Sequence, residues 1–239
     1  MSGLLYKNFR INFSSFLLAL IVTLISCAIT IAASILDGTD LITEDDGAML
    51  FFVLYYFGFM MPSLSSSLLF EADESKTASA FAMSLPQGGK GHIEAKYWYI
   101  LIQYLLVLFI TFLTDTVTYV ILGGTFSAAI LLVFIFSWRL LLSAIEIPFI
   151  IRFGSQKGVS IKGLVTAFIA MLAIVYLMFG DISWLINSDK PLKAFMEWLE
   201  SGRILFLISL FPFISCAAYY LSCKISIKVF RKGAENYEQ

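Results

Sequence analysis

Three charged residues, Asp115, Arg139 and Glu146, lie inside long apolar runs of this 239-residue sequence. A charge at the centre of a membrane-spanning helix costs about 2.5–3.5 kcal/mol on insertion scales, so such residues usually face a cavity or a partner. We expect the three to line a translocation path. At about 1.5 Å per residue, Asp115 lies about 10 Å and Arg139 about 20 Å from the outer ends of their helices, within reach of each other. A structural ion pair, or Arg139 bonded to helix carbonyls, is the alternative.

Other reactive residues give no recognisable catalytic or metal site. Cys27, Cys216 and Cys223 lie in or beside apolar runs without metal-ligand spacing, and the single histidine, His92, has no nucleophile beside it. The glycines before Lys90 superficially resemble a phosphate-binding loop but lack its spacing and the Ser or Thr that holds Mg²⁺. We therefore expect no enzyme activity and no cofactor in this chain, with any ATP and Mg²⁺ bound by another subunit.

The composition is that of an integral membrane protein. Hydrophobic residues make up 59% and charged residues 14%, against about 45–50% and about 25% in soluble domains. About 20 apolar residues cross a bilayer as a helix, which predicts an all-α fold with six transmembrane helices in a single domain over 1–239. The expected spans are Phe13–Leu36, Met49–Phe70, Tyr97–Leu122, Phe126–Ile151, Leu164–Gly180 and Arg203–Cys223.

The basic residues indicate the orientation of these spans. Twelve lie on one side of the six spans and only Lys190 and Lys193 on the other, with Arg139 and Arg203 in or at the edge of a span. Because cytoplasmic loops carry the excess of Lys and Arg, both termini are expected in the cytoplasm. Residues 1–12 are expected to form an interfacial helix.

Two outer segments stand out. The acidic loop Asp37–Ala48 is either a cation-binding site or, more commonly for such loops, only solvated. The segment 181–202 has apolar residues at helical spacing after Pro191, which predicts a short amphipathic helix at the outer interface.

The longest cytoplasmic segment, 71–96, is longer than a turn requires. It opens with a charged cluster, continues as an amphipathic helix over 77–85, and is stopped by Pro86 and the following glycines. Such a helix followed by a break indicates a docking surface for a cytoplasmic partner. The residues expected on it are Glu71, Asp73, Glu74, Lys76, Phe81, Leu85 and Pro86.

Several motifs in this order resemble small bacterial ABC-2 type permeases. They are the acidic cluster Glu71–Thr77, the stop Ser84–Pro86, the entry Glu94–Tyr97, the basic lead-in Leu4–Arg10 and the connection Pro148–Gly158. The resemblance covers the whole chain in layout, and its specific motifs cover about a quarter of it.

This resemblance implies a multi-pass protein of the bacterial plasma membrane that works with an ATP-binding cassette ATPase and a second permease copy. In that picture the segment after the second span is the coupling helix, and Arg152, Gly154 and Lys157 form a second cytoplasmic contact. The compact size resembles permeases that export amphipathic peptides, such as the phenol-soluble modulin exporter. Membrane lipid is an expected partner, and nucleic acid is not.

Other transport classes stay open at this point. A proton-coupled secondary transporter would use Asp115 and Glu146, but no three-plus-three repeat of the kind common in that class is visible. An ABC permease for lipid or a small hydrophobic drug is a further alternative, and a non-transporting scaffold would need no polar residues at mid-depth.

Overall fold

The computed structural model describes residues 2–37, 44–71, 88–121, 128–179 and 202–235, and all its elements are helices. In chain order they are α1 (Ser2–Ile11), α2 (Phe13–Asp37), α3 (Glu44–Glu71), α5 (Gly88–Ile121), α6 (Ala129–Phe153), α7 (Ser155–Phe179) and α10 (Gly202–Glu235). The predicted all-helical class is therefore confirmed for the described part of the chain.

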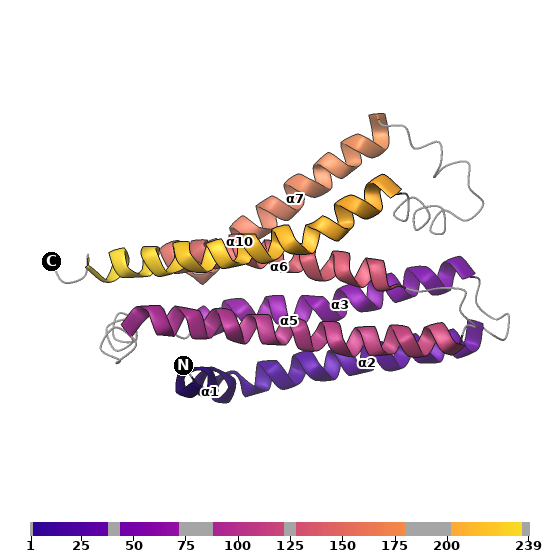
Figure 1. Ribbon diagram of the computed structural model, residues 1–239, viewed down its shortest axis with the longest axis horizontal. Helices are drawn as coiled ribbons and strands as arrows, with labels where there is room; N and C mark the ends of the chain where they lie inside the picture. The colour runs from indigo at the N-terminus through magenta and orange to yellow at the C-terminus, as the bar shows by residue number, and fades with distance from the viewer. Residues whose placement is uncertain (1, 38–43, 72–87, 122–127, 180–201, 236–239) are drawn as a thin grey trace.

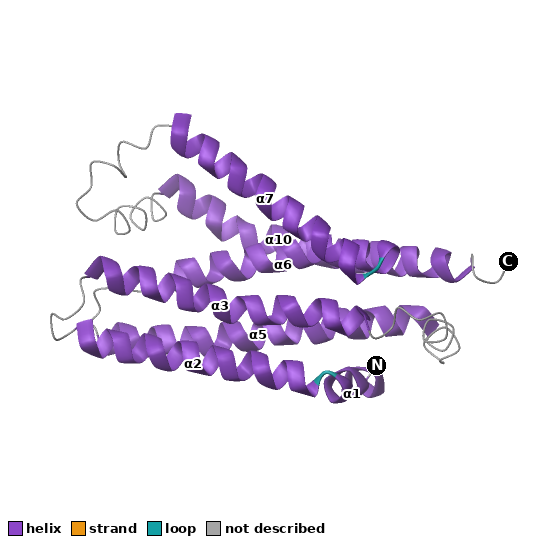
Figure 2. Cartoon of the chain, turned by 180° about the vertical axis from the view of Figure 1, so that it is seen from behind, coloured by secondary structure: helices purple, strands orange, loops and turns teal. Residues whose placement is uncertain are grey.

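The long helices run roughly along one axis as a bundle (Figure 1). α5 and α6 lie at its centre, where α2 packs along α3 and α5, and α10 packs along α6. α1 and the C-terminal end of α10 lie at the same end of the bundle, which Figure 2 shows from behind. At the opposite end, α7 and the first half of α10 diverge from the other helices (Figure 1).

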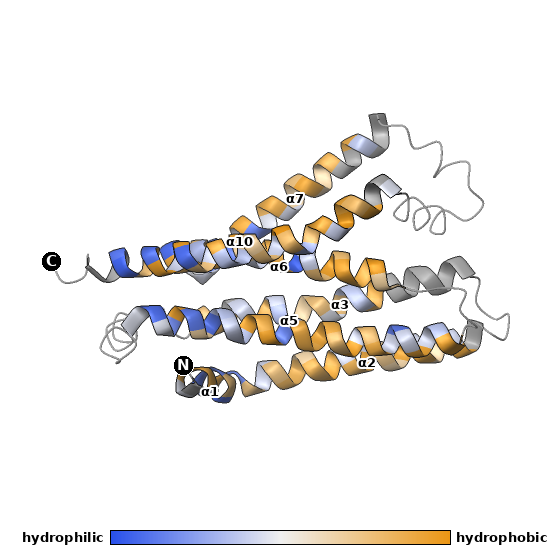
Figure 3. Ribbon diagram, viewed as in Figure 1, coloured by the Kyte–Doolittle hydropathy of each residue, from blue (hydrophilic) through white to orange (hydrophobic). Residues whose placement is uncertain are grey.

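Five described helices are long and apolar enough to cross a membrane. These stretches are Phe13–Ile35, Val53–Glu71, Gly88–Ile121, Ala129–Phe153 and Leu205–Lys232. α7 is not among them, although it covers most of the expected fifth span, so a sixth crossing stays a prediction. Hydrophilic residues gather at the α1 end of the bundle, especially on α5 and α10, while apolar residues dominate the middle (Figure 3).

The helix ends differ from the expected span ends. α5 begins at Gly88 rather than Tyr97, and α10 continues to Glu235 rather than stopping at Cys223. Both extensions carry charged residues, so hydropathy alone did not include them, yet the backbone hydrogen bonding of the helix continues through them. The predicted helices over 77–85 and within 181–201 lie outside the described residues, as do residues 38–43 of the acidic loop. The rest of that expected loop is helical, because α2 ends at Asp37 and α3 begins at Glu44.

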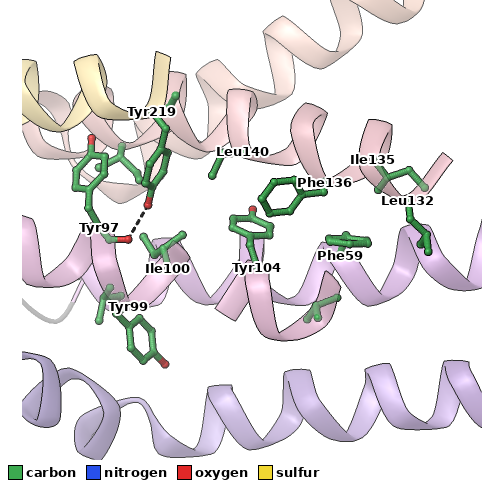
Figure 4. Close-up of a cluster of buried hydrophobic side chains, with 14 of the residues drawn as sticks. Phe59, Tyr97, Tyr99, Ile100, Tyr104, Leu132, Ile135, Phe136, Leu140 and Tyr219 are labelled. Carbon is green, nitrogen blue, oxygen red and sulfur yellow. Dashed lines mark hydrogen bonds between the residues drawn. The ribbon is translucent and has the colours of Figure 1, made fainter. Parts of the chain in front are cut away.

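Aromatic and branched side chains from four helices form the core. Phe59 of α3, Tyr104 of α5 and Phe136 of α6 lie near one another in Figure 4, and Phe59 and Phe136 meet edge to face with ring centroids 6.5 Å apart. Tyr219 of α10 donates a hydrogen bond of 2.8 Å to the main-chain oxygen of Tyr97 (Figure 4). The core therefore fixes α10 onto the central helices α5 and α6.

Candidate functional site

A buried ion pair joins three helices in the interior of the bundle. Lys162 Nζ of α7 lies 2.8 Å from Glu146 Oε2 of α6 and also donates a 2.8 Å hydrogen bond to Ser63 Oγ of α3. The Glu146 side chain is completely buried, whereas 16% of the Lys162 side chain is exposed. Because a buried carboxylate is costly without a partner, Lys162 stabilises Glu146 and attaches α7 to α6 and α3.

The turn between α6 and α7 creates this pair. Gly154 adopts φ 92°, a conformation that glycine adopts readily, and its N–H donates to Ile150 O at 2.8 Å to end α6. α7 starts immediately afterwards at Ser155. Gly158 then lies against Ile150 so closely that an added Cβ would be 3.0 Å from the Ile150 backbone. This close approach brings the two helices together along their next turns.

Arg139 lies on the same face of α6 as Glu146, two turns earlier. Its Cζ lies 4.3 Å from the centroid of the Tyr56 ring of α3, which is a cation–π contact. The residue is only 5% exposed, and its Nε and Nη2 have no hydrogen-bond partner among the described residues. Its position inside the bundle agrees with the predicted path, and that role stays a prediction.

The side chain of Asp115, a residue of α5, lies at the start of α6. Its Oδ1 accepts a 2.8 Å hydrogen bond from the backbone N–H of Ala128, the residue before the first turn of α6, where no local side chain caps the helix. A carboxylate at a helix N-terminus is favoured by the helix dipole. The hypothesis that Asp115 and Arg139 pair is therefore not supported, because Arg139 stacks on Tyr56 instead.

Buried hydroxyl groups surround the charged residues. Tyr104 Oη of α5 and Ser143 Oγ of α6 are 2.9 Å apart, one turn before Glu146, and both residues are fully buried. The arrangement provides a carboxylate, two cations and several hydroxyls at the junction of α3, α5, α6 and α7. Groups of these kinds can bind and orient charged or polar parts of a molecule; among the described residues no group of three His, Cys, Asp or Glu side chains is close enough to hold a metal ion.

Most of the predicted docking surface is not described. Glu71 is the last residue of α3 and is exposed; Asp73, Glu74, Lys76, Phe81, Leu85 and Pro86 lie outside the described residues. The two helix ends that flank this segment are fixed to each other by Lys96 of α5. Its Nζ donates to Leu69 O of α3 at 2.8 Å and lies 4.3 Å from the Phe70 ring centroid.

The second predicted cytoplasmic contact is at the α6–α7 turn. Arg152 and Lys157 are exposed there, on either side of Gly154. Arg152 lies over the neighbouring Phe153 ring, with Cζ 5.1 Å from its centroid. These three residues therefore share one exposed turn, which is the geometry a contact surface requires.

Sequence reasoning missed Lys162 and Tyr56 as members of this site. Lys162 was assigned to a loop because the fifth span was expected to begin at Leu164. A signal was nevertheless present: Glu146 and Lys162 each lie eight residues from Gly154, so a tight antiparallel turn at that glycine places them opposite each other. Tyr56 carried no comparable signal, because the rotation of α3 about its axis decides its neighbours.

Comparison with known protein families identifies the family of this chain. The family model described as "ABC-2 family transporter protein" matches residues 3–231, which is nearly the whole chain. No curated protein and no solved structure matches it.

Proposed function

The chain belongs to the ABC-2 transporter family, and on that premise we propose that it is the permease subunit of an exporter powered by a separate ATP-binding cassette ATPase. The family is a membrane transport component and not itself catalytic, and it normally works with an ATPase subunit. The observation that carries the proposal for this chain is the buried charged centre of Glu146, Lys162 and Arg139, because charged residues inside membrane helices are costly and commonly mark a substrate path.

The proposed cargo is an amphipathic or antimicrobial-type peptide, and the proposed assembly is a homodimer of permeases in the bacterial plasma membrane. Paired and unpaired charges beside apolar and aromatic surface suit a molecule with one polar and one apolar face. Lipid or a small hydrophobic drug is the alternative cargo. The export direction follows from the family resemblance alone.

We propose six crossings with both termini in the cytoplasm. The placement of α1 and the end of α10 at the same end of the bundle supports this topology, as does the gathering of hydrophilic residues there (Figure 3). The basic residues at that end include Lys90 and Lys96 of α5 and Lys228 and Arg231 of α10. An excess of Lys and Arg is the property that marks the cytoplasmic side of a membrane protein.

The proposed ATPase docks at the cytoplasmic segment 71–96 and at the exposed α6–α7 turn. Lys96 connects the two helices that flank the segment, since its bond to Leu69 O joins the end of α3 to the first part of α5. Movement of the segment between these ends would then be transmitted to both helices together. Closure of the ATPase subunits on ATP would in this way shift the permease between two states that differ in their affinity for cargo.

A pull-down from native membranes tests the ATPase assignment. Tagged protein in mild detergent is expected to retain an ATP-binding cassette subunit, and replacing Glu71, Asp73 and Glu74 with Gln or Asn is expected to release it. Replacing Glu44, Asp45 and Asp46 in the same way is the matched control, because it removes three acidic residues from the proposed outer side. If no ATPase is retained and the chain alone carries proton-dependent flux in vesicles, a secondary transporter replaces this proposal.

A further inference from the structure

Arg139 is a deeply buried cation with unused hydrogen-bonding capacity. Only 5% of the residue is exposed, and Nε and Nη2 have no hydrogen-bond partner among the described residues. A guanidinium carries a permanent charge and donates through all its N–H groups. Buried donors without acceptors cost free energy, and in native proteins they usually signal a missing partner.

Carboxylates of the same helix bundle do not supply that partner. Glu146, two turns further along α6, is held through Oε2 by Lys162 at 2.8 Å. Its second oxygen, Oε1, has no hydrogen-bond partner among the described residues, so it does not reach the Arg139 donors either. Within the described chain, the Arg139 charge is therefore left without a carboxylate in contact.

The two unpaired atoms of Arg139 form one edge of its guanidinium. Nε and Nη2 lie side by side and donate in parallel, which is the geometry that a carboxylate accepts with both of its oxygens. The Tyr56 ring covers a face of the same group, with Cζ 4.3 Å from the ring centroid. Stacking on an aromatic ring limits rotation of the guanidinium and leaves the donors in its plane.

We infer that Arg139 recognises a carboxylate of the transported molecule, bound side-on through Nε and Nη2 while Tyr56 holds the plane of the guanidinium. This inference rests on the proposed peptide cargo, since an unmodified peptide ends in a carboxylate. Binding there neutralises the buried cation and satisfies both donors. It therefore gives the loaded state an interaction that the empty state lacks, which is what a change in transport state requires.

The test compares two peptides on the purified chain in nanodiscs of zwitterionic lipid. A fluorescent amphipathic helical peptide made only of Leu, Ala and Lys is prepared with a free C-terminal carboxylate and as the amide. The free acid is expected to bind about tenfold more tightly, as a bidentate charge-assisted pair gives. Arg139→Gln is expected to abolish this preference and Arg139→Lys to keep part of it. Arg231→Gln, an exposed arginine at the end of α10, is the matched control and should keep the full preference.

Each other outcome overturns a defined part of the argument. Equal binding of acid and amide, or a preference that survives Arg139→Gln, overturns the Arg139 inference and leaves peptide cargo intact. If neither peptide binds, the cargo proposal fails, and thermal stabilisation by decanoate relative to decanol then decides the Arg139 inference alone. If anionic lipid added to wild-type nanodiscs abolishes the acid preference, and the same lipid raises the melting temperature of the wild type but not of Arg139→Gln, the site takes a lipid phosphate instead of a peptide carboxylate. A variant that no longer elutes as a single species on size exclusion is replaced by Arg139→Lys, whose loss of side-on geometry still predicts a weaker preference.

Discussion

Glu146 of α6 and Lys162 of α7 each lie eight residues along the chain from Gly154, and Lys162 Nζ lies 2.8 Å from Glu146 Oε2. The pair is more than a link between neighbours in a hairpin, because Lys162 also bonds Ser63 of α3. α7 packs on α6 and α3 and diverges from the bundle further along (Figure 1). The Lys162 contacts therefore hold the N-terminal part of α7 to α6 and α3.

Removing Lys162 should destabilise the protein more than removing a surface lysine. Lys162→Met leaves the Glu146 carboxylate buried without its cation, and we expect the free energy of unfolding to fall by about 3 kcal/mol, toward the low end for buried pairs because part of Lys162 is exposed. Titration with SDS in mixed micelles measures this change. The double variant Glu146→Gln/Lys162→Met should recover most of the loss, since no buried charge remains.

Lys90→Met provides the control for that experiment. Lys90 and Glu94 form an ion pair of 3.9 Å along one face of α5, and the Lys90 side chain is 54% exposed. Exposed pairs of this kind contribute about 0.3–0.5 kcal/mol. If Lys162→Met lowers the free energy of unfolding no more than Lys90→Met does, the buried pair does not hold α7.

The sequence could predict which stretches are apolar helices, but not how they turn toward one another. Asp115 and Arg139 have opposite charges and expected depths only about 10 Å apart, yet Asp115 bonds the Ala128 N–H and Arg139 stacks on Tyr56. The depth of a residue in the membrane follows from counting residues along its helix. Which side chains meet depends on how each helix is rotated about its own axis, and hydropathy carries no information about that rotation. The start of α7 was misplaced for a related reason: Lys157 and Lys162 lower the local hydropathy although the helix begins at Ser155.

Gly158 is predicted to be essential for the close approach of α6 and α7. An added Cβ would lie 2.2 Å from Ile150 Cγ1 and 3.0 Å from the Ile150 backbone, so Gly158→Ala must push the helices apart. We expect a loss of about 1–3 kcal/mol, as for an overpacked interior. Gly163→Ala on the same helix is the control, because nothing lies within 4 Å of its added Cβ and alanine favours the helix. Thermal unfolding in detergent of both variants measures the difference; equal melting temperatures would contradict the tight α6–α7 contact.

Asp115 is predicted to act as an acceptor at the start of α6 and not as a proton carrier. Asp115→Asn keeps a side-chain oxygen that can accept the Ala128 N–H, so stability and transport should change little. Asp115→Ala loses the acceptor and should cost about 1–2 kcal/mol, with faster hydrogen exchange at the first turn of α6. Thr116→Ala, an exposed neighbour that bonds only within α5 in the described structure, is the control. Loss of transport in a fully stable Asp115→Asn protein would instead indicate a proton relay.

Tyr97 is predicted to hold α10 to α5 through its hydroxyl group. Its Oη lies 2.7 Å from both Ser222 Oγ and Ser226 Oγ of α10, and all three residues are buried. Tyr97→Phe keeps the ring but removes this shared partner, and Ser222 retains only its bond to Ala144 O. We expect a loss of about 1 kcal/mol, measured by SDS titration. Tyr220→Phe is the matched control, since that tyrosine is 62% exposed on α10; a Tyr97 effect indistinguishable from it would show that apolar packing, and not this hydrogen-bond cluster, attaches α10.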